Sequence, residues 1–249
     1  MGKGLYLILP VMLTAVMEFH GVAAEIVTNT RDRIIFSSTA LSPDKGELSA
    51  TGYAAGLWDI QYSFNENLTA GAYVNLPFYV IGAFPHITLN TRISEHWSVG
   101  GGAITGIIGP YIDNPEQYYL FMAGGHLAAT GTYGRHLFNI NTTIAAVALH
   151  EKDYGLDFSN GALIIPNAGY RYSINGTWSF LAEAATVIGT AGSADMTGKY
   201  WFILYGLRVA GETVFGDFGF CFPAFKEYLR ETWKYTPLGI PYFTIGVKF

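Results

Sequence analysis

The chain ends in Pro241-Tyr242-Phe243-Thr244-Ile245-Gly246-Val247-Lys248-Phe249. Successive side chains of a β-strand point to opposite faces, so an apolar residue at every second position gives the strand one apolar face. Strands of this kind, closed by a terminal phenylalanine, are typical of the last strand of bacterial outer-membrane barrels. The stretch therefore predicts the closing strand of an all-β transmembrane antiparallel barrel, with an assembly signal formed by Phe243, Ile245, Val247 and Phe249.

The first residues predict export from the cytoplasm. Lys3 is followed by an apolar segment over residues 5–17 and by the small residues Val22-Ala23-Ala24. This order of charge, short apolar segment and small residues is typical of a secretory signal peptide. We therefore expect a signal peptide over residues 1–24, and an outer-membrane barrel with a short N-terminal lead-in over residues 25–249.

The composition selects among exported proteins. Half of the residues are hydrophobic and 13% are charged, yet after Ala24 no apolar run reaches the roughly twenty residues that a membrane helix needs. Thirty glycines and an aromatic content of 16% suit a barrel with aromatic girdles and small interior residues. The single Cys221 permits no internal disulfide. A net charge of −5 without a basic cluster argues against a nucleic-acid partner.

Five short polar segments between alternating runs predict tight turns, which join ten strands. An opening strand over residues 47–54 and the closing strand raise the number to about twelve, with ten or fourteen as alternatives, and we expect each strand to have about ten residues. The predicted turns are Asn65-Glu66-Asn67, Ser94-Glu95-His96, Tyr133-Gly134-Arg135, Asn175-Gly176-Thr177 and Gly211-Glu212-Thr213.

The other connections should lie at the opposite end of the barrel, outside the cell, because outer-membrane barrels have their tight turns in the periplasm. Most are short, which argues against a large adhesive or receptor surface. They are expected near Ala55, near Gly82, and over residues 110–116, 151–160, 191–199 and 224–236.

Alternation within each strand predicts which side chains face the interior. In the run from Leu68 to Asn75, Thr69, Tyr73 and Asn75 should point inward. The same reasoning assigns further polar residues to the interior, namely Asp59, Gln61, His86, Asn90, Arg92, Asn139, Asn141, Asn167, Arg171, Glu183, Arg208 and Asp217.

The charged interior residues allow two interpretations. They line a polar pore or ligand site, where uncompensated charge would set ion selectivity, or they form a salt-bridge network that braces the wall and narrows the passage. One hypothesis sets Arg92, Arg171 and Arg208 opposite Asp59, Glu183 and Asp217. The candidate lumen-lining residues are Asp59, His86, Arg92, Arg171, Glu183, Arg208 and Asp217.

Aromatic residues near the tight turns predict a membrane girdle formed by Trp97, Phe138, Tyr172 and Trp178. Barrel enzymes that act on lipids need a histidine next to a serine at the membrane edge. His126 is the one histidine expected to face lipid, and no serine stands two residues from it. The His150-Glu151-Lys152-Asp153 run lacks a second spaced histidine for a metal. The sequence therefore predicts no catalytic residues, no metal and no cofactor.

Several short motifs carry a resemblance. They are Arg33-Ile34-Ile35-Phe36-Ser37-Ser38-Thr39-Ala40, Pro43-Asp44-Lys45-Gly46-Glu47, the run from Ile60 to Gly71 and Trp97-Ser98-Val99-Gly100-Gly101-Gly102. In these motifs the chain resembles a group of bacterial outer-membrane barrel proteins to which no activity is assigned. The resemblance implies the fold and the outer membrane, and it implies no site residues.

From the sequence we expect a narrow passive conduit for small polar solutes or a structural barrel with a charge-paired lumen. A lipid-modifying enzyme and a small surface-interaction protein acting through its loops are the alternatives. The expected partners are outer-membrane lipid and, during biogenesis, the barrel-assembly machinery, with small polar solutes in the lumen.

Overall fold

The structure is a computed structural model that describes residues 39–41, 43–53, 57–75, 80–110, 118–151, 156–191, 194–195, 197, 200–225, 229 and 236–249. The expected signal peptide over residues 1–24 lies outside these residues, as does the connection expected near Ala55. Of the expected lead-in, residues 39–41 and 43–47 are described.

Nearly all described residues belong to strands. These are β1 (Leu48–Tyr53), β2 (Leu57–Asn65), β3 (Leu68–Asn75), β4 (Val80–Arg92), β5 (Trp97–Pro110), β6 (Tyr118–Tyr133), β7 (His136–Glu151), β8 (Leu156–Ser173), β9 (Trp178–Thr186), β10 (Ile188–Ala191), β11 (Ala194–Asp195), β12 (Trp201–Ala210), β13 (Val214–Pro223) and β14 (Ile240–Lys248).

The strands form one closed antiparallel sheet. From β1 to β8 each strand pairs with its neighbours in sequence, and the wall continues through β9, β12, β13 and β14. Because β14 pairs with β1, the sheet returns on itself. β9 and β10 share one register along β8 and form a single strand of the wall, while β11 pairs with β10 in the hairpin that leads into β12. Over the described residues the wall therefore has twelve strands, which confirms the all-β barrel and its strand number.

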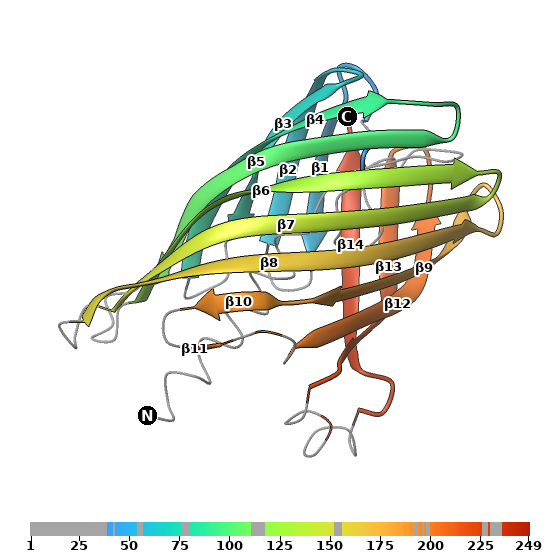
Figure 1. The fold of residues 1–249 in the computed structure, drawn as a ribbon. Coiled ribbons are helices and arrows are strands. Elements are labelled where there is room, and N and C mark those ends of the chain that lie inside the picture. The colour runs from blue at the N-terminus through green and yellow to red at the C-terminus, as the bar shows by residue number, and fades with distance from the viewer. Residues whose placement is uncertain are drawn as a thin grey trace.

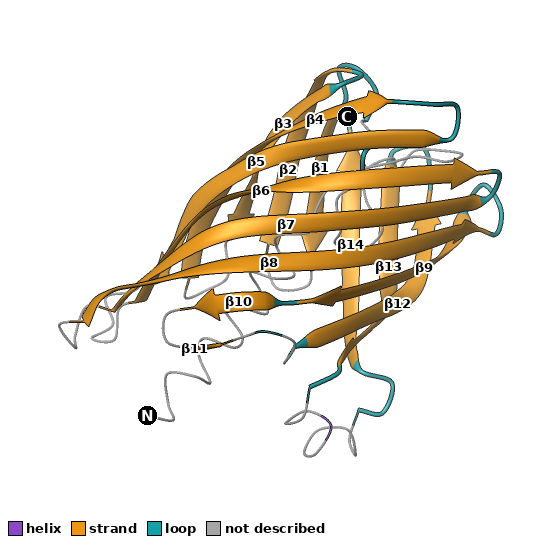
Figure 2. Ribbon diagram, in the orientation of Figure 1, coloured by secondary structure: helices purple, strands orange, loops and turns teal. Residues whose placement is uncertain are grey.

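Figure 1 shows the long strands β5 to β8 crossing the front of the barrel, with β14 running behind them in another direction. Figure 2 shows that strands make up almost the entire wall. Among the described residues, no helix has the length and apolar character needed to cross a bilayer.

All five predicted tight turns are present, and they lie at one end of the barrel, which we call the turn end. The opposite end, where the longer connections lie, is the loop end. Gly134 adopts a φ of 58° in the turn between β6 and β7, a conformation that glycine reaches without steric cost. The opening strand is also confirmed as β1.

Three expectations about the strands are wrong. Gly82 was expected in a connection, but it lies inside β4, where it pairs with Asn75 and Ile108. Strands β5 to β8 have 14 to 18 residues instead of about ten. The polar segment at the start of β8 was read as loop, yet its backbone continues to pair with β7, as in Ala148 with Asn160. Backbone pairing depends on register and tolerates polar side chains.

The two faces of the wall differ in burial as alternation requires. In β2, buried and exposed side chains alternate from Leu57 to Phe64. The exposed set is apolar and aromatic and includes Ile60, Leu89 and Phe243. Such an outer face suits hydrocarbon and would be costly against water.

The interior changes character along the barrel axis. On β4, the buried polar residues His86, Thr88 and Asn90 lie toward the turn end, whereas the buried Phe84 lies toward the loop end. On β7, Asn139 and Asn141 come first and Val147 follows. The interior is therefore mainly polar near the turn end and mainly apolar near the loop end.

Candidate functional site

The polar half of the interior contains an ion pair without solvent contact. Arg208 on β12 faces Asp217 on β13 directly across the strand pair. Its Nε donates to Asp217 Oδ1 at 2.6 Å and its Nη2 donates to Oδ2 at 2.8 Å. Neither side chain is accessible to solvent. The Phe215 ring lies 5.4 Å from the guanidinium carbon and adds a cation–π contact.

A second buried pair joins β2 and β4. His86 Nε2 on β4 is 3.1 Å from Asp59 Oδ1 on β2, and both side chains are buried. The Tyr73 ring lies 4.8 Å from the His86 ring, centroid to centroid, on the strand between them. Carboxylate and imidazole are thus held in place by a hydrogen bond and by ring packing.

The remaining predicted interior charges are bonded to neutral side chains. Asn167 Nδ2 donates to Glu183 Oε1 at 2.6 Å, and Arg171 Nε donates to Ser179 Oγ at 3.2 Å. All four residues are buried. Six of the seven candidate lumen-lining residues therefore lie in a bonded interior layer, namely Asp59, His86, Arg171, Glu183, Arg208 and Asp217.

The seventh candidate, Arg92, is exposed and lies at the turn end. Its Nε donates to Ser94 O at 3.0 Å and its Nη2 donates to Glu95 O. The hypothesis that sets Arg92 opposite an interior carboxylate is therefore wrong. Alternation assigns Arg92 to the inner face, but it is the last residue of β4 and lies at the edge of the wall. Its partners are therefore the carbonyl groups of the following turn.

The apolar half of the interior was not foreseen from the sequence. Its side chains belong to a cluster of buried residues that also includes Leu137 and Leu181 near the turn end. The partly buried Leu41, Tyr200 and Phe225 pack against this cluster. Alternation gave no signal where apolar residues are consecutive, as in Leu163-Ile164-Ile165. Charge-free strand segments are the sequence signal that could have revealed it. Members of the cluster include Tyr53, Leu57, Phe84, Met122, Val147, Leu163, Val187, Phe202, Leu204 and Tyr242.

Glycines on the inner wall leave room for large neighbours. A Cβ on Gly71 would come within 2.8 Å of His86 Nε2, and a Cβ on Gly206 would come within 2.8 Å of the Tyr242 hydroxyl. On Gly102 it would meet His126 Cε1 at 2.6 Å. Real side-chain carbons do not approach so closely, so these large interior side chains lie over glycine positions, one strand away for His86 and His126 and two strands away for Tyr242.

The N-terminal lead-in occupies part of the lumen. Thr39 and Ala40 are almost fully buried, and Leu41 packs against the interior cluster. The backbone N–H of Ala40 donates to Thr130 Oγ1 on β6 at 2.7 Å, and that hydroxyl donates to Asn139 Oδ1 at 2.9 Å. The segment therefore lies against the inner wall at the polar end of the barrel.

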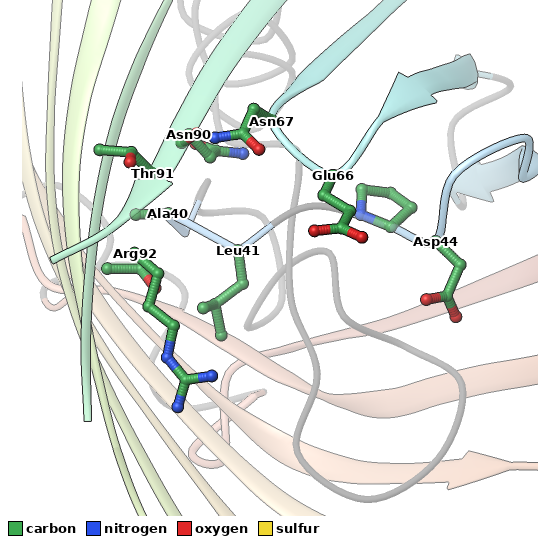
Figure 3. Close-up of a pocket in the computed structure, with 10 residues that line it drawn as sticks. Ala40, Leu41, Asp44, Glu66, Asn67, Asn90, Thr91 and Arg92 are labelled. Atoms are coloured by element: carbon green, nitrogen blue, oxygen red, sulfur yellow. Dashed lines mark hydrogen bonds between the residues drawn. The ribbon is translucent and has the colours of Figure 1, made fainter. Parts of the chain in front are cut away.

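A pocket of about 640 Å³ lies between this lead-in and the wall. We call it the turn-end pocket. Figure 3 shows Asp44 and Glu66 on one side of it, Arg92 on the other and Leu41 between them. The amide of Asn67 donates to Asn90 O at 2.8 Å and closes the wall side. Its lining residues are Ala40, Leu41, Pro43, Asp44, Glu66, Asn67, Asn90, Thr91, Arg92 and Ser98.

The four girdle residues predicted from the sequence lie on the outer face, on strands next to the tight turns. Trp97, Phe138 and Trp178 are exposed, and Tyr172 is partly exposed. Trp97 Nε1 donates to the Tyr133 hydroxyl at 2.7 Å. Their role in anchoring the barrel stays a prediction, as does the role of Phe243, Ile245, Val247 and Phe249 in assembly, whose side chains also face outward on the last strand.

The histidine expected to face lipid does not do so. His126 is partly buried and shares the inward register of Met122, Ala128 and Thr130 on β6. The small residues around it, Gly124 and Gly125 among them, hid this register in the sequence. His96 and His136 are exposed beside the tight turns, where His136 Nδ1 is 2.8 Å from the Tyr170 hydroxyl. Among the described residues, no three metal-binding side chains come together.

No family model and no curated protein matches the chain. Among the solved structures that are similar to it at low identity are the following three. The NanC porin has 10% identity and a TM-score of 0.49, with 82% of this chain and 98% of that chain covered. A Pseudomonas aeruginosa FadL homologue has 8% identity and a TM-score of 0.41, with 71% of this chain and 70% of that chain covered. OmpT, an outer membrane protein of Vibrio cholerae, has 9% identity and a TM-score of 0.33, with 82% of this chain and 94% of that chain covered. At this similarity nothing about function follows for this chain.

Proposed function

We propose that the protein is an outer-membrane barrel that acts as a narrow conduit for small polar solutes and is closed at rest by its own N-terminal lead-in. The observation that carries this proposal is the position of Thr39 and Ala40, which lie buried inside the barrel. The apolar outer face and the aromatic residues near the turns support the membrane location.

The attachment of the lead-in suits a segment that moves. The hydrogen bond from Ala40 N to Thr130 Oγ1 joins it to the wall, and Leu41 adds an apolar contact. A net hydrogen bond of this kind contributes about 1 kcal/mol, whereas the strands of the wall are held by ladders of backbone pairs to both neighbours. Opening of the conduit requires that the lead-in leave this position while the barrel stays folded.

Planar-bilayer conductance tests the proposal on refolded protein. The wild type should be mostly silent, with rare openings, and deletion of residues 25–43 should give steady conductance. A variant locked by a disulfide between Ala40→Cys and Thr130→Cys, made in a Cys221→Ala background, should not conduct at all. Adding a reductant should restore the rare openings of the wild type. The reduced double-cysteine protein is the matched control for the substitutions themselves.

A silent deletion variant would refute the conduit and leave the structural barrel as the function, because the interior network would then fill the lumen without the lead-in. A locked variant that conducts like the wild type would show that the lead-in is not the closing element. Heat-modifiable migration on gels confirms in each case that the barrel has folded.

Arg92 should set part of the selectivity of the opened conduit, since it stands at the mouth. In the deletion variant, Arg92→Gln should shift the reversal potential under a salt gradient toward cation selectivity, because a positive charge is removed from the path. The matched control is Arg135→Gln, which changes an exposed arginine of another turn that does not line the pocket. An unchanged potential would place Arg92 outside the conducting path.

A further inference from the structure

We propose that the turn-end pocket binds a small zwitterionic solute, with its cationic group at Glu66 and its anionic group at Arg92. This inference names the solute class of the proposed conduit and rests on that function for its physiological role. The binding itself follows from the geometry of the pocket.

Two opposite charges line the pocket without pairing. No ion pair or side-chain hydrogen bond engages the Glu66 carboxylate among the described residues, and no carboxylate of that part of the chain lies within ion-pair distance of Arg92. Asp44 lies on the same side as Glu66. Elsewhere in the described part of the barrel, Arg208 lies 2.6 Å from Asp217 and Lys248 lies 3.0 Å from Glu47. The pocket therefore has a negative and a positive side chain that do not pair with each other.

Arg92 is oriented before any solute arrives. The carbonyl oxygens of Ser94 and Glu95 accept from its Nε and Nη2, and these two bonds leave both hydrogens of Nη1 for another acceptor. Main-chain carbonyls orient the guanidinium without neutralising its charge. A carboxylate or phosphate of a solute can thus bind at little cost in side-chain entropy.

The rest of the lining suits the middle of such a solute. Leu41 stands between the two charged sides, and Pro43 also lines the pocket, so the aliphatic carbons of a solute have an apolar surface to cover. Asn67, Asn90 and Ser98 supply the polar wall. An anion alone would meet the carboxylates, and a cation alone would meet Arg92, so each singly charged solute gains one contact and suffers one repulsion.

The pocket is shared by the lead-in and the wall. Leu41 and Asp44 precede β1, whereas Arg92 and Ser98 belong to β4 and β5. A solute that reaches both sides contacts the segment that closes the conduit. Its binding and the release of that segment are then thermodynamically linked, and each changes the equilibrium of the other by the same factor.

Binding can be measured by saturation-transfer NMR with the full chain in detergent micelles. The probes are glycine, 4-aminobutyrate and 6-aminohexanoate, which separate the two charges by increasing lengths, and hexanoate and hexylamine, which carry one charge each. We expect one of the longer amino acids to bind at least tenfold more tightly than hexanoate and hexylamine. Arg92→Gln and Glu66→Gln should each weaken its binding about tenfold, whereas Arg135→Gln and Glu212→Gln, at other turns, should not.

Equal binding of hexanoate and of every amino acid would overturn the proposal in favour of a simple anion site, and equal binding of hexylamine would overturn it in favour of a cation site. Unchanged affinity in both pocket variants would place the solute elsewhere. The measurement involves no conduction, so a barrel that never conducts and still binds 6-aminohexanoate would refute the conduit and support the pocket.

Discussion

The buried ion pair between Arg208 and Asp217 gives the sharpest test of the interior. Arg208→Met removes the guanidinium and leaves the Asp217 carboxylate buried without its two charge-assisted hydrogen bonds, which measure 2.6 and 2.8 Å. Hydrogen bonds to charged groups each contribute about 1.5–3 kcal/mol. Breaking one side of a fully buried pair typically costs about 3–5 kcal/mol. Because both side chains have no solvent contact, we expect the full loss of about 3–5 kcal/mol.

The double variant Arg208→Met with Asp217→Leu distinguishes the loss of the ion pair from the cost of leaving one buried charge unpaired. Replacing both partners by apolar residues removes the buried charges together, so we expect a stability within about 1 kcal/mol of the wild type. Urea unfolding in micelles, followed by tryptophan fluorescence and by gel mobility, measures both variants. Arg135→Met at an exposed turn is the control, and its unfolding midpoint should not change.

A loss below about 1 kcal/mol for Arg208→Met would mean that water or another side chain reaches Asp217. A double variant as unstable as the single one would show that the stability comes from the packing of the long arginine side chain instead. Either result would refute the view of the interior as a charge-paired brace.

Two further predictions concern the wall. Val247→Asp places a charge on the outward face of the closing strand. It should cost less than the about 2–4 kcal/mol that an arginine or lysine costs at the bilayer midplane, because aspartate costs less and the position lies close to a tight turn. This variant and a deletion of Phe249 should both insert poorly, and normal heat-modifiable migration and membrane fractionation of both would contradict the assignment. Gly71→Ala puts a methyl group against the Ile60 carbonyl oxygen and His86 Nε2, and should cost about 1–3 kcal/mol in urea unfolding. Gly176→Ala, with no atom within 4 Å of the added methyl group, should cost nothing, and an equal effect of the two would refute the crowding.

The sequence predicted the strands best where one face is apolar throughout. From Leu68 to Asn75 every second residue is apolar or alanine, and the buried residues are those that alternation assigns inward. It predicted the tight turns because polar residues and glycine interrupt the pattern there. Alternation failed in Leu163-Ile164-Ile165, where neither face is polar, and around His126, where small residues fit either face. Hydrophobicity has no period in such segments, so only strand pairing decides the face.

The candidate site was harder to predict than the fold. The inward register of Asp59, Glu183 and Arg208 follows from their own strands, but their partners depend on which strands are neighbours and on how they are staggered. The turn-end pocket requires in addition that Leu41, from a segment without strand pattern, enters the barrel. No periodic signal marks that path, because it depends on contacts such as the one between Ala40 and Thr130.

The seam of the barrel has a consequence for the order of folding. β1 pairs with β14 only over the register from Ser49 to Tyr53, and the ion pair between Lys248 Nζ and Glu47 Oε2, at 3.0 Å, joins residues 201 positions apart. Hairpins such as β6–β7 close locally, whereas joining ends so distant in sequence costs on the order of 5 kcal/mol in chain entropy. The seam should thus form last, as the rate-limiting step, and its amide protons should exchange with solvent first.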